Sequence, residues 1–151
     1  SDHTPPDLLA RDLFRDRFIC AVRHAHPLHS GRLTAERYAS SDHVDVAQHV
    51  PQSAGNLGPI DGRLKVQGLQ RNIVMIVGGF ATAIAMARQS DLVATVPELH
   101  TSNLRTGMAK VELPFAPINV TVSMLWHPRM DADPAHRWLR EEVRSVCAEN
   151  Q

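Results

Sequence analysis

The sequence predicts an α/β protein of three layers, in which a mixed, mostly parallel sheet lies between helices. Two observations lead to this prediction. Short apolar runs typical of strands alternate along the chain with segments of helical periodicity, which requires crossover connections between parallel strands. Proline and glycine also stand at the boundaries of these segments, where they end strands and open helices.

Six segments have the pattern of β-strands. Three of them are continuous apolar runs of the kind found in buried strands, and 72–77 is one of these. The segment 118–124 instead alternates apolar with polar residues, as expected of a strand with one buried face. The predicted strands are 18–22, 44–50, 72–77, 92–96, 110–113 and 118–124.

Start signals precede the segments with helical periodicity. The Thr34 hydroxyl is a candidate N-cap, Pro59 lies in a first helical turn, and Asp133 with Pro134 opens the last helix. Apolar residues recur at helical spacing from there as far as Cys147. The predicted helices are a short turn after Thr34, 59–69, 80–87, 98–105 and 134–147.

Composition excludes several classes of protein. The chain has 151 residues, and its 16 basic residues balance 16 acidic ones, so it is expected to bind DNA poorly. Its apolar stretches are far shorter than the roughly twenty residues that span a bilayer, so no membrane partner is expected. Residues 1–6 do not resemble a secretory signal, and the two cysteines, Cys20 and Cys147, are interpreted as buried reduced thiols. These features favour the cytoplasm.

No catalytic or metal-binding motif is found. The sequence has no Gly-x-Ser-x-Gly, no His-Glu-x-x-His and no phosphate-binding loop with lysine. His24, His26 and His29 lie close together, but no carboxylate or thiolate accompanies them at a supporting spacing, so a solvated turn is favoured over a metal site. We therefore expect no enzyme activity, no metal and no cofactor.

Two places are candidates for ligand binding. Open α/β sheets bind ligands beyond the carboxyl ends of their strands, where backbone amides and helix N-termini converge. The turn 77–82 follows one predicted strand, and the loop 52–56 follows another. The glycine pair at Gly78 and Gly79 would let a ligand approach the backbone, although glycine pairs also end strands for purely conformational reasons.

Three stretches resemble the effector-binding domain of LysR-type transcriptional regulators. They are 13–28 (LFRDRFICAVRHAHPL), 69–97 (with RNIVMIVGGF and SDLVATVP) and 125–143 (LWHPRMDADPAHRWLREEV). The resemblance implies a periplasmic-binding-protein-like fold of type 2, with residues 26–118 as the second lobe. Residues 1–25 and 119–151 would be a remnant of the first lobe, and the family's DNA-binding winged helix-turn-helix would be absent from this chain.

The resemblance also implies a function. In that family, a small organic inducer binds in a cleft between the lobes and shifts the regulator between states. Carried over by position, the contact residues are Gly79, Phe80, Thr95 and Val96. Thr82 belongs to the same turn, and Ser53 and Asn56 are further candidates from the loop. The inducer is expected to be an aromatic or other organic acid, and DNA would be bound only through the missing N-terminal domain.

The last helix bears on assembly. In a truncated lobe, part of the sheet that this helix should cover would be missing. The apolar side chains of Trp138, Leu139 and Val143 would then be exposed, and exposed apolar surface favours association. We therefore expect a dimer or a swapped assembly.

Two alternatives to a regulator stay open: a solute-binding protein of a transport system, and a small α/β enzyme. The gene sequence upstream of Ser1 would separate the first from a regulator, since it would encode an export signal rather than a winged helix.

Overall fold

The structure is a computed structural model that describes residues 7–47 and 58–149. The chain divides into two compact units, one formed by residues 17–118 and the other by 1–16 with 119–151. The boundary between residues 16 and 17 lies within a long strand, and the boundary between residues 118 and 119 lies at the start of another. Whether these units are the two predicted lobes stays a prediction, and each unit is described here by itself.

The unit of residues 17–118 is built on a mixed sheet with the strand order β3-β2-β4-β1-β5. The strands are β1 (Leu9–Val22), β2 (Asp42–Val46), β3 (Asn72–Val77), β4 (Val93–Pro97) and β5 (Ala109–Val111). β2 is parallel to its neighbours β3 and β4, whereas β1 is antiparallel to β4 and β5. The carboxyl ends of β2, β3 and β4 therefore lie at one edge of the sheet.

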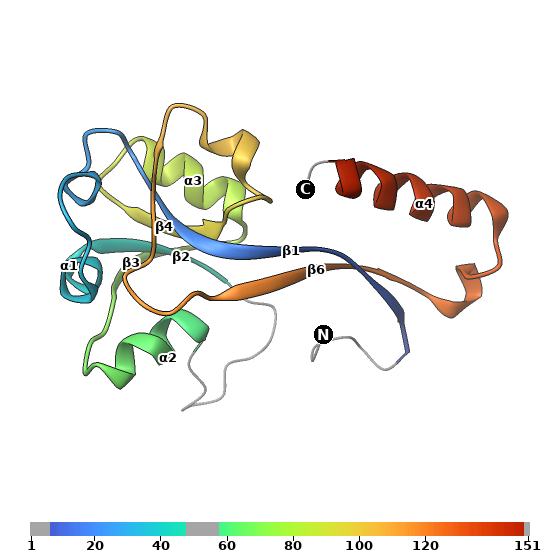
Figure 1. Cartoon of the computed structure of the whole chain (residues 1–151), viewed down its shortest axis with the longest axis horizontal. Coiled ribbons are helices and arrows are strands. Elements are labelled where there is room, and N and C mark those ends of the chain that lie inside the picture. Colours follow the sequence, from blue (N-terminus) through green and yellow to red (C-terminus); the bar gives the residue numbers. More distant parts are fainter. Residues whose placement is uncertain (1–6, 48–57, 150–151) are drawn as a thin grey trace. The chain divides into compact units, whose positions relative to one another are not determined.

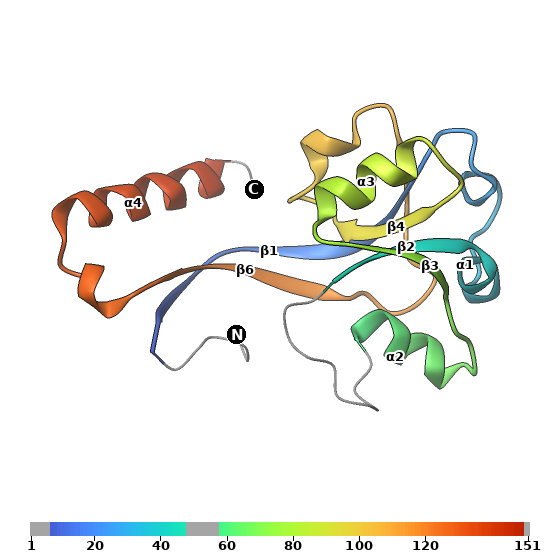
Figure 2. The same cartoon turned by 180° about the vertical axis from the view of Figure 1, so that it is seen from behind.

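Helices cover both faces of this sheet, as predicted. Figures 1 and 2 show α3 (Phe80–Arg88) on one face and α1 (Ala35–Ser40) with α2 (Pro59–Val66) on the other. Alanine-rich α3 packs against Ile19, Ala21 and the other side chains of one core cluster. The second cluster, on the opposite face, includes the fully buried Tyr38 and Leu64. The predicted three-layer α/β architecture is confirmed.

The predicted capping signals are found where the sequence placed them. The Thr34 hydroxyl accepts a hydrogen bond from the backbone N–H of Arg37 at 3.1 Å and so caps α1. Pro59 is the first residue of α2. The predicted helix 98–105 is reduced to a 3₁₀ turn over Ser102–Arg105, and further 3₁₀ turns lie at Pro27–His29 and Pro128–Met130.

The unit of residues 1–16 and 119–151 contains a strand pair and a long helix. β6 (Asn119–Trp126) pairs with β1, and the Ser123 hydroxyl donates to the Asp12 carboxylate at 2.7 Å. The helix α4 (Pro134–Glu149) begins as predicted, because the Asp133 carboxylate accepts from the N–H of His136 at 3.1 Å. None of the described helices is long and apolar enough to cross a membrane.

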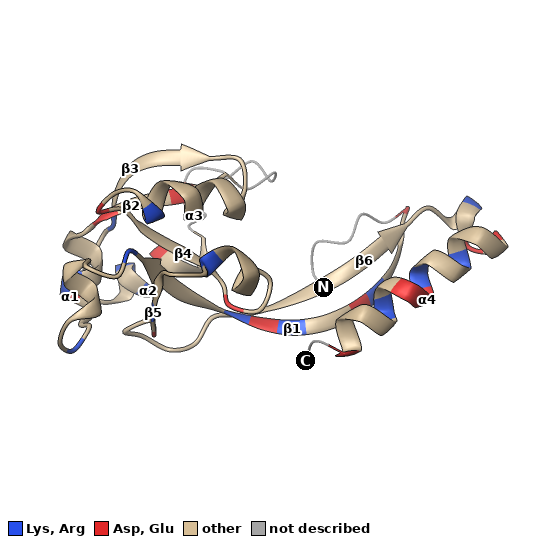
Figure 3. Ribbon diagram, turned by 90° about the horizontal axis from the view of Figure 1, so that it is seen from above, with Lys and Arg blue, Asp and Glu red and all other residues tan. Residues whose placement is uncertain are grey.

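Three predictions from apolar patterns were wrong in detail. The predicted buried strand 72–77 is an edge strand, and its residues Ile73 to Ile76 are between 37% and 66% exposed. In Figure 3, β3 is drawn without the colours of charged residues. The apolar run therefore predicted correctly that this segment is a strand, but not that the strand is exposed. β2 ends at Val46 instead of Val50; residues 48–50 lie outside the described part. Cys20 is fully buried as expected, whereas Cys147 on α4 is only half-buried.

Polar side chains pair between the sheet and the helices α1 and α2. The Tyr38 hydroxyl lies 2.6 Å from the Thr95 hydroxyl, and His43 Nε2 lies 2.6 Å from the Tyr38 carbonyl oxygen. Arg71 donates two hydrogen bonds to the Asp61 carboxylate, at 2.7 and 2.8 Å. These hydrogen bonds hold the sheet in a defined position against the helices that cover it, although His43 Nδ1 has no hydrogen-bond partner among the described residues.

Candidate functional site

The best-formed part of the predicted site is the start of α3. Gly79 is the N-cap, and its carbonyl oxygen accepts the first helical hydrogen bond from Ala83 at 3.1 Å. The amides of Phe80, Ala81 and Thr82 precede that bond and have no partner within the helix. Gly79 supplies no capping side chain. Three amides at the positive end of a helix dipole are thus available to an anion.

The space around the two glycines is open. A Cβ atom added to Gly78 or Gly79 would meet no other atom within 4 Å. The Gly79 backbone is extended, with a φ of −166° that any residue adopts. Glycine is therefore not required there by backbone conformation, and its effect is to leave the amides uncovered.

Aromatic rings flank this turn. The Phe80 ring packs edge-to-face against Phe18, with centroids 6.2 Å apart, and against His100, with centroids 6.1 Å apart. Phe80 is half-buried and His100 is exposed. The arrangement places an apolar wall beside the uncovered amides, which suits a ligand with an anionic group and an apolar body.

A charged network fixes the segment that follows β4. Glu98 receives hydrogen bonds from Arg17 at 2.6 Å and from Lys110 at 2.9 Å, and Arg17 also pairs with Glu112. The Lys110 ammonium and the Arg17 guanidinium hold the pKa of Glu98 below its ordinary value, and Arg17 does the same for the pKa of Glu112. These contacts tie β1 and β5 to the segment after β4, which also carries His100.

The structure brings together only part of the predicted site. Gly79, Phe80 and Thr82 share the first turn of α3, and Thr82 is exposed there. Thr95 and Val96 are buried instead, and they point to opposite faces of β4: the Thr95 hydroxyl is bonded to Tyr38, while Val96 belongs to the core under α3. Ser53 and Asn56 lie outside the described residues.

Two residues next to the turn were missed by sequence reasoning. The sequence pattern places Phe18 only within a buried strand. His100 lies just beyond the carboxyl end of β4, a position that the rule for parallel strands indicates as a ligand contact. Of the three histidines in the 24–29 turn, His24 and His29 are exposed, but His26 is buried with Nε2 at 2.7 Å from the Asp91 carbonyl oxygen. His26 thus packs the turn in place.

Comparison with known proteins gives relatives of one kind. The HTH-type transcriptional regulator SyrM of Rhizobium meliloti (strain 1021) is 32% identical over 147 residues, which cover 95% of this chain and 44% of that protein. The HTH-type transcriptional activator NagR of Ralstonia sp is 28% identical over 133 residues, covering 87% of this chain and 43% of that protein. The chain therefore spans less than half the length of these curated relatives. Both are named as transcriptional regulators and not as enzymes, in agreement with the sequence-based expectation.

Solved structures agree in fold. The regulatory domain of MexT, a transcriptional activator in Pseudomonas aeruginosa, matches with a TM-score of 0.75 at 27% identity, covering 96% of this chain and 70% of that one. The effector binding domain of QuiR in complex with shikimate matches with a TM-score of 0.70, covering 97% of this chain and 68% of that one; at 12% identity it shows likeness of fold alone. The family described as LysR substrate binding domain matches residues 1–148. The chain belongs to the LysR substrate-binding domain family.

Proposed function

We propose that this chain is the inducer-sensing part of a LysR-type transcriptional regulator that acts in the cytoplasm. Its inducer is a small organic acid, whose anionic group accepts hydrogen bonds from the α3 amides of residues 80–82. The uncovered start of α3 carries this proposal, because three amides, an open approach at Gly79 and the aromatic pair of Phe80 and His100 meet there. Thr82, exposed on the same turn, is a further contact in this proposal.

The buried residues have a supporting role. Thr95 and Val96 do not face open space, so we assign them to holding β4 and hence the segment that carries His100. DNA binding is assigned to another part of the regulator, since the chain's net charge is zero. The names of SyrM and NagR favour a regulator over a solute-binding protein of a transport system, which is the second candidate.

A variant at the N-cap tests the inducer site. In Gly79→Asp, the new carboxylate caps the α3 amides and takes the place of the ligand's anion, because Asp is a preferred N-cap residue. We expect the free energy of unfolding of this variant to equal that of the parent chain or to exceed it by about 0.5 kcal/mol. Gly79→Ala is the matched control, because its methyl group meets no neighbour and offers no hydrogen-bond acceptor.

The assay is a thermal-shift screen with benzoate, salicylate, shikimate and succinate. At least one acid should raise the melting temperature of the parent chain and of Gly79→Ala, but not that of Gly79→Asp. An acid that stabilises all three proteins equally binds elsewhere, and that result would refute the placement of the inducer at α3.

We also propose that a second copy of the chain covers part of the exposed apolar surface. The support is the uncharged edge strand β3 and the last helix, where Trp138 is 65% and Leu139 is 52% exposed. Sedimentation velocity at micromolar concentration should show a dimer whose dissociation constant rises in Ile76→Lys. A monomer at that concentration contradicts the proposal.

A further inference from the structure

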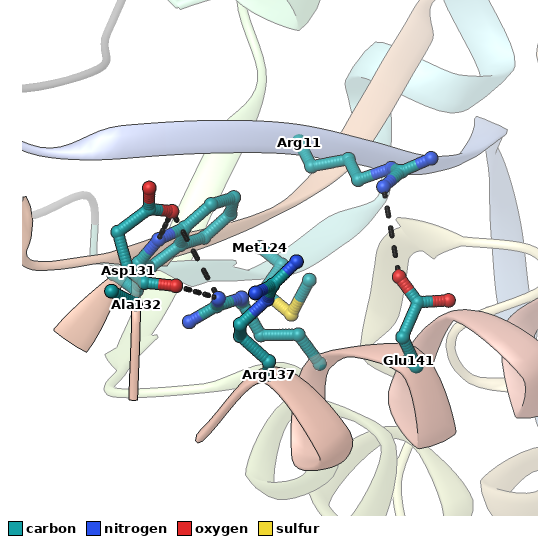
Figure 4. Close-up of a pocket in the computed structure, with 8 residues that line it drawn as sticks. Arg11, Met124, Asp131, Ala132, Arg137 and Glu141 are labelled. Atoms are coloured by element: carbon teal, nitrogen blue, oxygen red, sulfur yellow. Dashed lines mark hydrogen bonds and ion pairs between the residues drawn. The ribbon is translucent and has the colours of Figure 1, made fainter. Parts of the chain in front are cut away.

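A cavity lies within the unit of residues 1–16 and 119–151. Its volume is about 400 Å³, and it is lined by Arg11 of β1, by side chains of β6, by two residues that precede α4, and by side chains of the first half of α4 (Figure 4). That volume falls within the range of small-molecule sites, roughly 300–1,000 Å³. The cavity shares no lining residue with the α3 turn, so it is a separate feature of the chain.

One wall of the cavity is apolar. Met124 and Trp126 are two residues apart on β6 and therefore face the same side of the strand. Trp126 is half-buried, and its indole N–H donates to the Asp131 carboxylate at 3.1 Å. The thioether and the indole give a flat ligand an apolar surface to lie against.

Arg140 gives the cavity a fixed positive charge. Its side chain is only 10% exposed, and its guanidinium lies over the Trp126 ring with 4.6 Å to the centroid. It donates to the carbonyl oxygens of Met130 at 3.1 Å and Asp131 at 2.8 Å, whereas the nearest Asp131 carboxylate oxygen is 3.9 Å away. The charge is held in place mainly by neutral carbonyl groups.

Arg137 adds a second cation, whose guanidinium has no partner among residues 7–47 and 58–149. Figure 4 shows its side chain reaching toward Met124, between Asp131 and Glu141. Within the described parts of the chain, the Arg137 guanidinium makes no hydrogen bond and no ion pair. Glu141, the acidic residue one turn further along α4, is engaged by Arg144 at 3.1 Å and by Arg11 at 3.9 Å.

The charges that line the cavity do not cancel. Three guanidinium groups, of Arg11, Arg137 and Arg140, face two carboxylates, of Asp131 and Glu141. Arg144, which lies outside the lining, pairs with Glu141 from the other side. The cavity therefore has at least one positive charge in excess, beside an apolar wall.

We propose that this cavity binds a small organic monoanion with a flat apolar body, of the aromatic carboxylate class. Arg137 donates to the carboxylate, where its planar guanidinium can form two parallel hydrogen bonds. The ring of the ligand lies against Met124 and Trp126. Arg140 stays on the indole and adds to the positive field. The chain would then bind organic acids at two places, of which this one does not depend on α3.

NMR titration of the isotopically labelled chain with benzoate tests the proposal, and benzamide is the uncharged control ligand. Benzoate should shift the indole N–H resonance of Trp126, and benzamide should bind much more weakly. Arg137→Gln should weaken benzoate binding at this resonance roughly tenfold, because it removes a charge-assisted pair. Arg15→Gln is the matched control variant: Arg15 is an exposed arginine of β1 outside the cavity lining. It should change the affinity by less than about twofold.

Three results would overturn the proposal. Benzoate and benzamide binding equally would show that the charge has no role. Equal affinities of Arg137→Gln and Arg15→Gln would show that any anion attraction is general. Benzoate shifts confined to residues 80–82, with the Trp126 indole unmoved, would support the inducer site at α3 and exclude this one. Both variants replace exposed arginines, so their amide spectra should show that they remain folded.

Discussion

His43 should make the stability of the fold depend on pH. The imidazole is fully buried on β2, its Nε2 faces the Tyr38 carbonyl, and its ring packs edge-to-face on Tyr38 with centroids 4.6 Å apart. Nδ1 is buried with no hydrogen-bond partner in the described residues. A proton on Nδ1 would thus be a buried charge without an acceptor, and burial lowers the pKa of His43 from 6.5 to about 4.

The magnitude follows from linkage. As pH falls below 6.5, His43 takes up a proton in the unfolded chain but not in the folded one until pH reaches about 4. The unfolded state then binds more protons than the folded state, so the free energy of unfolding decreases as the pH is lowered across this window. Between about pH 7.5 and about pH 4.5, the loss due to His43 alone is about 2.5 kcal/mol.

Urea unfolding followed by circular dichroism at the two pH values measures this loss. His43→Gln keeps an N–H donor near the Tyr38 carbonyl but does not titrate, so its free energy of unfolding should fall by about 2.5 kcal/mol less than that of the parent chain. His29→Gln, at an exposed position, should behave as the parent does. Equal losses in the parent and in His43→Gln would refute the reasoning.

Three further substitutions test the packing of the same unit by chemical denaturation at neutral pH. Tyr38→Phe removes the hydroxyl 2.6 Å from Thr95 and should cost about 1–3 kcal/mol, since a buried Thr95 hydroxyl loses its partner; a cost near zero would mean that water replaces the bond. Leu64→Ala, at a fully buried position, should cost about 2–5 kcal/mol, and an unchanged midpoint would contradict the core described for α2. Arg71→Met leaves the Asp61 carboxylate without its bidentate partner and should cost about 3 kcal/mol; an unchanged free energy of unfolding would argue against a stabilising ion pair.

Local signals predicted the elements well. The caps at Thr34 and Asp133, the proline that opens α2 and the alternation of 118–124 depend on a few neighbouring residues, and each was found in the structure. The alternation of strands and helices predicted the layered α/β architecture, and the resemblance to LysR-type effector domains added the periplasmic-binding-protein-like fold.

Burial and long-range pairing were harder to predict. The run at 72–77 is equally apolar whether a strand is central or at an edge, so the exposure of β3 could not be read from it. Phe80 and His100 meet only because β3 and β4 are parallel neighbours of β2, which is a property of the sheet. Likewise, Arg140 reaches Trp126 through the fold of α4 back toward β6, over fourteen positions of sequence.

The central claim is that an organic acid binds the uncovered amides of α3, and amide NMR tests it most directly. Each acid of the screen would be titrated into the labelled chain and into Gly79→Asp. We predict that an acid which raises the melting temperature also shifts the backbone N–H resonances of Phe80, Ala81 and Thr82, and that Gly79→Asp abolishes these shifts. A stabilising acid that leaves these three resonances unmoved would contradict the account.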